Sequence, residues 1–321
     1  MSREIGGYLE LERYQGEPYH PGAVALNSAR NCLAYLAELR GIERIALPDL
    51  MCDAVSGTCE REGIAVRTFE VGEGFALPSE LAVSEGEWLY VADYYGRLSC
   101  SEVERARSAS GGRLVVDEVQ GFFREPWAGV DTIYTCRKFF GVPDGAYLIT
   151  RDGSRLGREL SKGSSRARMA HVVGRMEDGS AEWYGAYRAS EESIDAEPLA
   201  AMSETTLSLM AAVDFPFARR RREENYAILD EALGGRNRLA AGSPEGPYMY
   251  PLLVEDSAGL RDRLAEAGVF VPTLWPNVLA ECPAPSWAHR YARDVLPLPV
   301  DQRYNRDDME YVASCVKSVL R

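Results

Sequence analysis

Strand-like and helix-like segments alternate between about residue 28 and residue 150, and this alternation constrains the fold more than any other feature of the chain. ERIALP (43–48), EWLYVADYY (87–95) and RLVVDEV (113–119) are short apolar runs with the length of buried strands. ARNCLAYLAELR (29–40) lies between Ser28 and Gly41, which predicts an amphipathic helix with defined caps. Strands joined through helices predict an α/β domain with a mostly parallel sheet covered on both faces.

The rest of the chain predicts a second, smaller unit. Residues 151–200 are polar and charged, and we expect loop and helix there, around a site or a subunit interface. A long helical stretch follows, which Pro216 could break. After it we predict the strand YMYPLLV (248–254), the helix SAGLRDRLAEAG (257–268), the strand VFVPTLW (269–275), a Pro-rich loop, the strand LPLPV (296–300) and a closing helix over 306–320. The expected organisation is an N-terminal segment (1–20), a large domain (21–203), a connecting helix (204–234) and a small α+β domain (235–321).

Composition excludes several classes of protein. The 36 basic and 49 acidic residues leave a net charge of −13, which disfavours binding to nucleic acids and to anionic membrane surfaces. No apolar run approaches the roughly 20 residues of a membrane span. The seven cysteines form no CxxC pair and the three histidines have no ligand spacing beside them, so we expect no metal site. We expect a cytoplasmic protein.

Side chains that could take part in catalysis lie at the ends of two predicted strands. Asp117 ends one predicted strand and Gln120 follows three residues later, while Lys138 follows the next strand among aromatic residues. Partial desolvation lowers the pKa of a lysine and makes its amine a usable nucleophile. An acid on a neighbouring strand end can hold a cationic ring nitrogen. Taken alone, Asp117 and Lys138 fit an ordinary salt bridge better.

A third feature changes that balance. Asn27 and Ser28 precede a predicted helix that starts with the small residue Ala29. The free N–H groups and positive dipole end of such a helix bind anions, although a plain N-cap has the same sequence. A helix-start anion site, a strand-end acid and a strand-end lysine together match what pyridoxal phosphate needs: a phosphate site, a partner for the ring nitrogen and a Schiff-base lysine.

At these positions the chain resembles the DegT/StrS-like sugar aminotransferases, a group of the fold-type I pyridoxal phosphate enzymes. The resemblance covers roughly residues 20–320 and rests on the order of five segments: LNSARNCLAYL, IALPDLMCDAV, VVDEVQ, CRKFFGVPDGAY and VLPLPVDQRY. It implies the mostly parallel, seven-stranded sheet of that fold with a smaller C-terminal α+β domain.

The resemblance also implies the catalytic pair. Lys138 would be the lysine that binds the cofactor aldehyde and would act as general base and acid. Asp117 would pair with the protonated pyridine nitrogen. Gln120 would lie against the ring hydroxyl.

Further cofactor contacts follow from the same resemblance. Ser28 and Ala29, with the backbone of Arg30, would hold the phosphate. The residue that covers the ring face would come from LPDLMCDAV, where Cys52, or its neighbour Met51, is the nearest match.

Three other residues could have either a functional role or a purely structural one. Tyr95 ends a strand on the side of the site and could line the cofactor pocket, or it could be half-buried packing. Arg303 could bind a substrate anion, or it could bridge to Asp301. Tyr8 could reach a neighbouring site in a dimer as a substrate contact, or it could belong to a flexible start.

The expected function is a pyridoxal phosphate-dependent aminotransferase that acts, with an amino donor, on a small keto or aldehyde acceptor. A nucleotide-linked keto sugar or a natural-product intermediate is the expected acceptor, and a homodimer with shared active sites the expected assembly. Two alternatives stay open: a non-transaminating enzyme on the same fold, such as a lyase, decarboxylase or cyclase, and a non-catalytic regulatory protein. A dinucleotide-binding protein is disfavoured because no GxGxxG follows the first strand.

Overall fold

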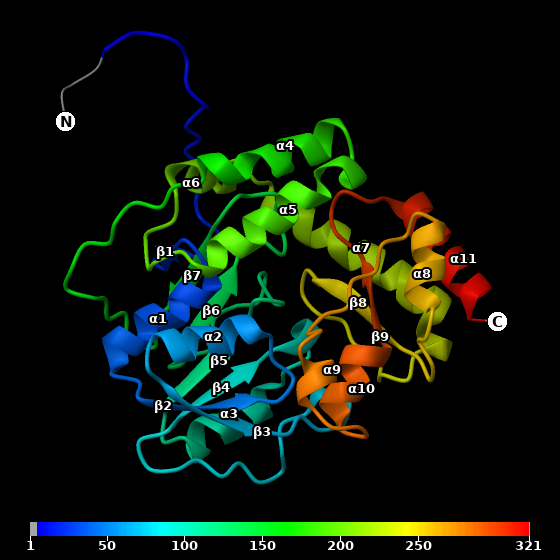
Figure 1. Cartoon of the computed structure of the whole chain (residues 1–321), viewed down its shortest axis with the longest axis horizontal. Coiled ribbons are helices and arrows are strands. Elements are labelled where there is room, and N and C mark those ends of the chain that lie inside the picture. Colours follow the sequence, from blue (N-terminus) through cyan, green and yellow to red (C-terminus); the bar gives the residue numbers. More distant parts are fainter. Residues whose placement is uncertain (1–4, 321) are drawn as a thin grey trace.

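The computed structural model describes residues 5–320 and contains a seven-stranded sheet in the order β1-β7-β6-β5-β4-β2-β3 (Figure 1). β6, β5, β4, β2 and β3 are parallel neighbours, whereas β7 is antiparallel to both β6 and β1. β1 therefore runs in the same direction as β6. The strands are β1 (Val24–Leu26), β2 (Arg44–Pro48), β3 (Ala65–Phe69), β4 (Trp88–Ala92), β5 (Leu114–Asp117), β6 (Asp131–Thr135) and β7 (Ala146–Ile149).

Helices cover both faces of this sheet. α1 (Ala29–Arg40) and α2 (Asp53–Arg61) share a core with Tyr90 and Val115 on one face. α3 (Cys100–Ala109) packs on the other face, against Leu89 and Val116. Successive side chains of a strand point to opposite faces, so each strand contributes to both cores. The predicted α/β fold class is confirmed.

Two helices fill much of the polar segment 151–200. α4 (Met169–Glu177) and α5 (Ser180–Asp195) form an antiparallel helical hairpin that lies above α1 and the β1–β7 side of the sheet in Figure 1. The long helical stretch that follows is two helices, α6 (Glu204–Ala211) and α7 (Phe215–Leu233). Pro216 lies in the first turn of α7, where a missing N–H costs nothing.

The C-terminal part forms a small α+β unit. β8 (Met249–Leu253) pairs with β9 (Val295–Pro299), and α7, α8 (Leu260–Glu266) and α11 (Arg306–Val319) share their core. The strand predicted over 269–275 is wrong. Val269 and Val271 are buried on either side of exposed Phe270, but Pro272 lacks an N–H, and within residues 5–320 the second sheet consists of β8 and β9 alone. The segment predicted as a Pro-rich loop contains α9 (Val278–Glu281) and α10 (Trp287–Asp294).

The small unit docks beside the carboxyl ends of the parallel strands. Tyr94 and Tyr95 follow β4 and share one apolar cluster with Trp275 and Tyr291. Within residues 5–320, no helix is both long enough and apolar enough to cross a bilayer.

Candidate functional site

Asp117 ends β5 at the carboxyl edge of the sheet, on the face that α1 and α2 cover. Its side chain is buried, Tyr90 Oη donates to Oδ2 at 2.7 Å, and the Val119 backbone N–H donates to Oδ1 at 2.8 Å. Burial raises the pKa of the Asp117 carboxyl, whereas the charge of Lys138 and these two hydrogen bonds act to lower it. The carboxylate is thus held in one orientation and lies within the field of a cation.

Lys138 lies in the turn that follows β6. The Phe139 and Phe140 N–H groups donate to the Cys136 carbonyl and define this turn. Lys138 is exposed to solvent, although neighbouring protein atoms displace part of the water around its ammonium group. This desolvation lowers the pKa of the ammonium group, and the charge of Asp117 acts in the opposite direction. Lys138 and Asp117 therefore lie close enough for the charge of each to act on the pKa of the other.

The start of α1 lies at the same edge because β1 is parallel to β6. Ser28 Oγ accepts a hydrogen bond from the Asn31 N–H at 3.2 Å, and the first two N–H groups of α1, those of Ala29 and Arg30, have no partner inside the helix. The Arg30 guanidinium pairs with Asp195 of α5 at 2.7 Å, while its Nε is buried and has no hydrogen-bond partner within residues 5–320. These donors together have the chemistry of an anion site.

Cys52 and Gln120 complete the local arrangement. Cys52 caps α2, and its thiol lies near Lys138, Asp117 and Arg30, while burial raises its pKa. The side chain of Gln120 accepts a hydrogen bond from the Tyr95 backbone N–H at 2.9 Å.

Tyr95 is buried and adopts a left-handed conformation with φ 58°. Among the described residues its hydroxyl has no hydrogen-bond partner, which is costly for a buried group.

Tyr8 lies apart from this cluster, whereas Arg303 follows Gln302, whose side chain donates to the Phe139 carbonyl at 2.9 Å next to Lys138. Tyr8 is 98% exposed on the N-terminal segment, which extends beyond α6 in Figure 1. Arg303 pairs with Asp301 at 2.7 Å and lies over the ring of Tyr304. Their roles toward a substrate stay predictions.

Three further residues near Lys138 and Asp117 were not found by sequence reasoning. Tyr90 lies on the predicted strand 87–95, so strand register could have placed it beside Asp117. The Tyr248 ring lies 5.7 Å from Lys138 Nζ, and the Glu191 carboxylate is close enough to raise the pKa of Lys138. These last two come from distant segments, and no local pattern marks them.

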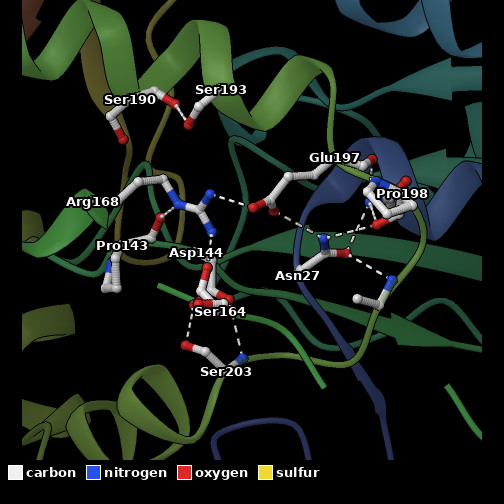
Figure 2. Close-up of polar contacts among 12 residues, drawn as sticks. Asn27, Pro143, Asp144, Ser164, Arg168, Ser190, Ser193, Glu197, Pro198 and Ser203 are labelled. Atoms are coloured by element: carbon white, nitrogen blue, oxygen red, sulfur yellow. Dashed lines mark hydrogen bonds and ion pairs between the residues drawn. The ribbon is translucent and has the colours of Figure 1, made fainter. Parts of the chain in front are cut away.

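A buried polar network joins the segments that surround the site (Figure 2). Arg168 donates to Glu197, to the Pro143 carbonyl at 3.1 Å and to the Ser164 carbonyl at 2.7 Å. Glu197 also accepts from the Asn27 side chain at 3.2 Å, and Asn27 directly precedes Ser28. The network links the turn after Lys138, the start of α1 and both ends of the α4–α5 hairpin.

A second buried carboxylate holds the end of the turn that follows β6 and contains Lys138, here called the lysine turn. Asp144 accepts hydrogen bonds from the Ser203 N–H at 3.0 Å and the Ser203 hydroxyl at 2.7 Å (Figure 2). The Gly145 N–H donates to the Asn27 carbonyl at 2.9 Å, so the lysine turn and the α1 start are joined directly. Within residues 5–320, no group of three or more His, Cys, Asp or Glu residues could hold a metal ion.

Comparison with solved structures gives a consistent result. The sugar aminotransferase CalS13 from Micromonospora echinospora matches with a TM-score of 0.65 at 18% identity, over 95% of this chain and 93% of that one. A DegT DnrJ EryC1 StrS aminotransferase from Brucella abortus matches with a TM-score of 0.61 at 12% identity, over 92% and 85%. The chain has the sugar aminotransferase fold. A Streptococcus pneumoniae protein described as a sugar aminotransferase, in its PLP form, matches with a TM-score of 0.64 at 14% identity, over 92% and 86%.

The sugar aminotransferase fold spans nearly the whole chain, including the small C-terminal unit. The resemblance read from the sequence is confirmed at the level of the fold. No protein-family model matches the sequence, and no curated protein matches it.

Proposed function

We propose that the protein is a pyridoxal phosphate-dependent aminotransferase. The observation that carries this proposal is the approach of Lys138 and Asp117, two strand-end groups whose charges act on each other's pKa. Lys138 can bind the aldehyde of this cofactor and Asp117 can pair with its ring nitrogen. The nearby helix start, with its free N–H groups, can bind the phosphate.

The residues present fit the cofactor phosphate. Its oxygens need donors, and the α1 start offers the Ser28 hydroxyl with the N–H groups of Ala29 and Arg30. Arg30 Nε is a buried donor without a partner in the part of the chain that the structure describes, and a bound anion can satisfy such an atom. The hydrogen-bond donors of Ser28, Ala29 and Arg30 therefore suit a bound phosphate.

Each residue of the pair then has a defined task. Bound pyridoxal phosphate supplies an electron sink for the bond that breaks at the substrate α-carbon. The lowered pKa of Lys138 favours the neutral amine, whose Nζ would take the proton from that carbon and deliver it to the cofactor carbon C4′, the shift that transamination requires. Asp117, fixed by Tyr90 and Val119, would accept a hydrogen bond from the ring N–H of the cofactor and keep that proton in place.

The proposed acceptor is a small keto or aldehyde compound, namely a nucleotide-linked keto sugar or a natural-product intermediate. The matched proteins described as sugar aminotransferases support the first class. We also propose the cytoplasm as the location, because the seven cysteines are all free and suit a reducing compartment.

A homodimer with shared sites belongs to the same proposal. Exposed apolar side chains on the α4–α5 hairpin, among them Met176 and Tyr184, are candidates for its interface. Light scattering of the purified protein measures its mass, and a monomer at micromolar concentration contradicts the shared site.

The reaction type is tested by adding L-glutamate to the purified coloured protein without an acceptor. We expect the absorbance of the pyridoxal form to be replaced by that of the pyridoxamine form, because the donor's amino group stays with the enzyme. A lyase or decarboxylase would release product without this stoichiometric change. A regulatory protein would show no change, and either outcome contradicts the proposal.

A further inference from the structure

Arg222 of α7 carries a positive charge in the interior of the protein, where the residue is 1% exposed. Within residues 5–320 its guanidinium donates to uncharged oxygens, namely the side-chain oxygen of Gln302 at 2.8 Å and the carbonyl oxygens of Pro247 at 2.9 Å, Phe139 at 3.0 Å and Tyr248 at 3.3 Å. Burial lowers the pKa of this guanidinium to about 10. A buried cation that donates to neutral groups is costly to keep, which indicates that its contacts matter beyond packing.

The Phe139 carbonyl, next to Lys138 in the chain, is held by two donors. Arg222 Nη2 donates to it at 3.0 Å and Gln302 Nε2 at 2.9 Å. Arg222 Nε in turn donates to Gln302 Oε1, so the three groups form a closed ring of hydrogen bonds. The guanidinium carbon also lies 4.7 Å from the centre of the Phe139 ring, within the range of a cation–π contact. Arg222 therefore fixes both the backbone and the side chain of the residue that follows Lys138.

A second connection between Arg222 and Lys138 is made by Tyr248. The Tyr248 carbonyl accepts a hydrogen bond from Arg222, and the Tyr248 ring lies 5.7 Å from Lys138 Nζ and 5.7 Å from the ring of Phe139. Tyr248 directly precedes β8, and Gln302 follows β9. One side chain of α7 thus connects the ends of both strands of the small unit to the lysine turn of the large domain.

We propose that Arg222 is a positioning residue for the proposed reaction, because it holds Phe139 and Tyr248 and thereby keeps the Lys138 amine in its place. The inference rests on the proposed function and goes beyond it, since Arg222 itself would touch neither substrate nor cofactor. A catalytic group misplaced by about 1 Å can slow a reaction about 100-fold, so a backbone contact next to Lys138 can decide the rate. A purely structural role would instead lower stability and leave the rates of the folded protein unchanged.

The test compares variants in two measurements on the folded protein. The first is the rate at which cofactor-free protein attaches added pyridoxal phosphate, followed by visible absorbance, and the second is the conversion of the loaded protein by increasing L-glutamate. We expect Arg222→Met to slow attachment about 10-fold and to lower the maximal conversion rate about 10- to 100-fold. The glutamate concentration that gives half of this rate should stay within about 3-fold of that of the wild type, because no substrate contact is lost. Arg222→Lys keeps the charge without the planar fork and should recover part of both rates.

Gln302→Leu is the second variant, because it removes one donor from the Phe139 carbonyl at a half-buried position and leaves Arg222 in place. It should slow both processes by a smaller factor than Arg222→Met, and it decides the question if Arg222→Met does not fold. Arg220→Met is the matched control, since Arg220 is exposed on the same helix, and it should leave both rates unchanged.

Wild-type rates in Arg222→Met or in Gln302→Leu, or an equal loss in Arg220→Met, would each overturn the inference. The proposed function itself fails on separate observations made with the wild-type protein alone, namely no uptake of pyridoxal phosphate or no conversion by L-glutamate.

Discussion

At the residue scale, a second buried acid, Glu118, lies next to Asp117 at the end of β5. Glu118 follows Asp117 and is fully buried, with Trp127 Nε1 donating to its Oε1 at 2.6 Å and the Asp93 carboxyl within hydrogen-bond contact. Asp93 faces it and is held by Arg124 and the Leu98 N–H, both at 2.7 Å. Burial, and then the charge of Asp93, raise the pKa of Glu118 well above its usual value. Glu118 is therefore the member of the pair that keeps the proton.

This raised pKa predicts how stability depends on pH. The bound proton stabilises the fold fully below the unfolded pKa of about 4.3, and that contribution is lost as pH rises toward the folded pKa. Glu118→Gln keeps an uncharged side chain of the same shape, so the free energy of unfolding of this variant should not contain this pH-dependent loss. Urea denaturation at pH 5 and pH 8 should therefore show the free energy of unfolding of the variant rising relative to that of the wild type, by at most about 1.4 kcal/mol per pH unit. A difference that does not change with pH would show that Glu118 ionises freely.

At the element scale, caps made some boundaries predictable and weak periodicity hid others. Ser28 and Gly41 mark the ends of α1 in the sequence, and the structure uses both as caps, with Gly41 at φ 64°. The α4–α5 hairpin had no such signal, because its exposed faces mix apolar and charged residues. For the same reason Glu191 and Asp195 could not be placed beside Arg137 and Arg30 from the sequence. Lys138, Asp117 and Ser28 could be placed, since strand ends and helix starts meet at one sheet edge.

The hairpin's anchor gives a prediction for this element. Arg168 joins the hairpin to Glu197 and to the lysine turn, and its side chain is 6% exposed. Arg168→Met leaves Glu197 partly buried without its cation, and we expect a loss of about 3 kcal/mol in the free energy of unfolding. Chemical denaturation measures this loss. Arg188→Met, on the exposed face of α5, should cost less than about 0.5 kcal/mol. Equal effects of the two substitutions would contradict a stabilising anchor.

At the scale of the whole molecule, the large and small units meet where the site lies. Phe75, Tyr95 and Trp275 are the non-glycine residues with positive φ within residues 5–320, and all three belong to the cluster between the units. Each such conformation costs about 1–3 kcal/mol and persists only where packing enforces it. The ring of Tyr95 lies 5.6 Å from that of Phe75 and 6.2 Å from that of Trp275. The docking of the small unit therefore also holds the turn that contacts Gln120.

The account as a whole depends on where the cofactor becomes attached, and the chain offers only three lysines for it: Lys138, Lys162 and Lys317. The most direct measurement is borohydride reduction of the purified coloured protein, followed by mass spectrometry of its peptides. We predict a reduced pyridoxyl adduct on Lys138, and none in a Lys138→Arg variant. An adduct on Lys162, which is exposed and paired with Glu204, or on Lys317 of α11, or no adduct at all, would contradict the account.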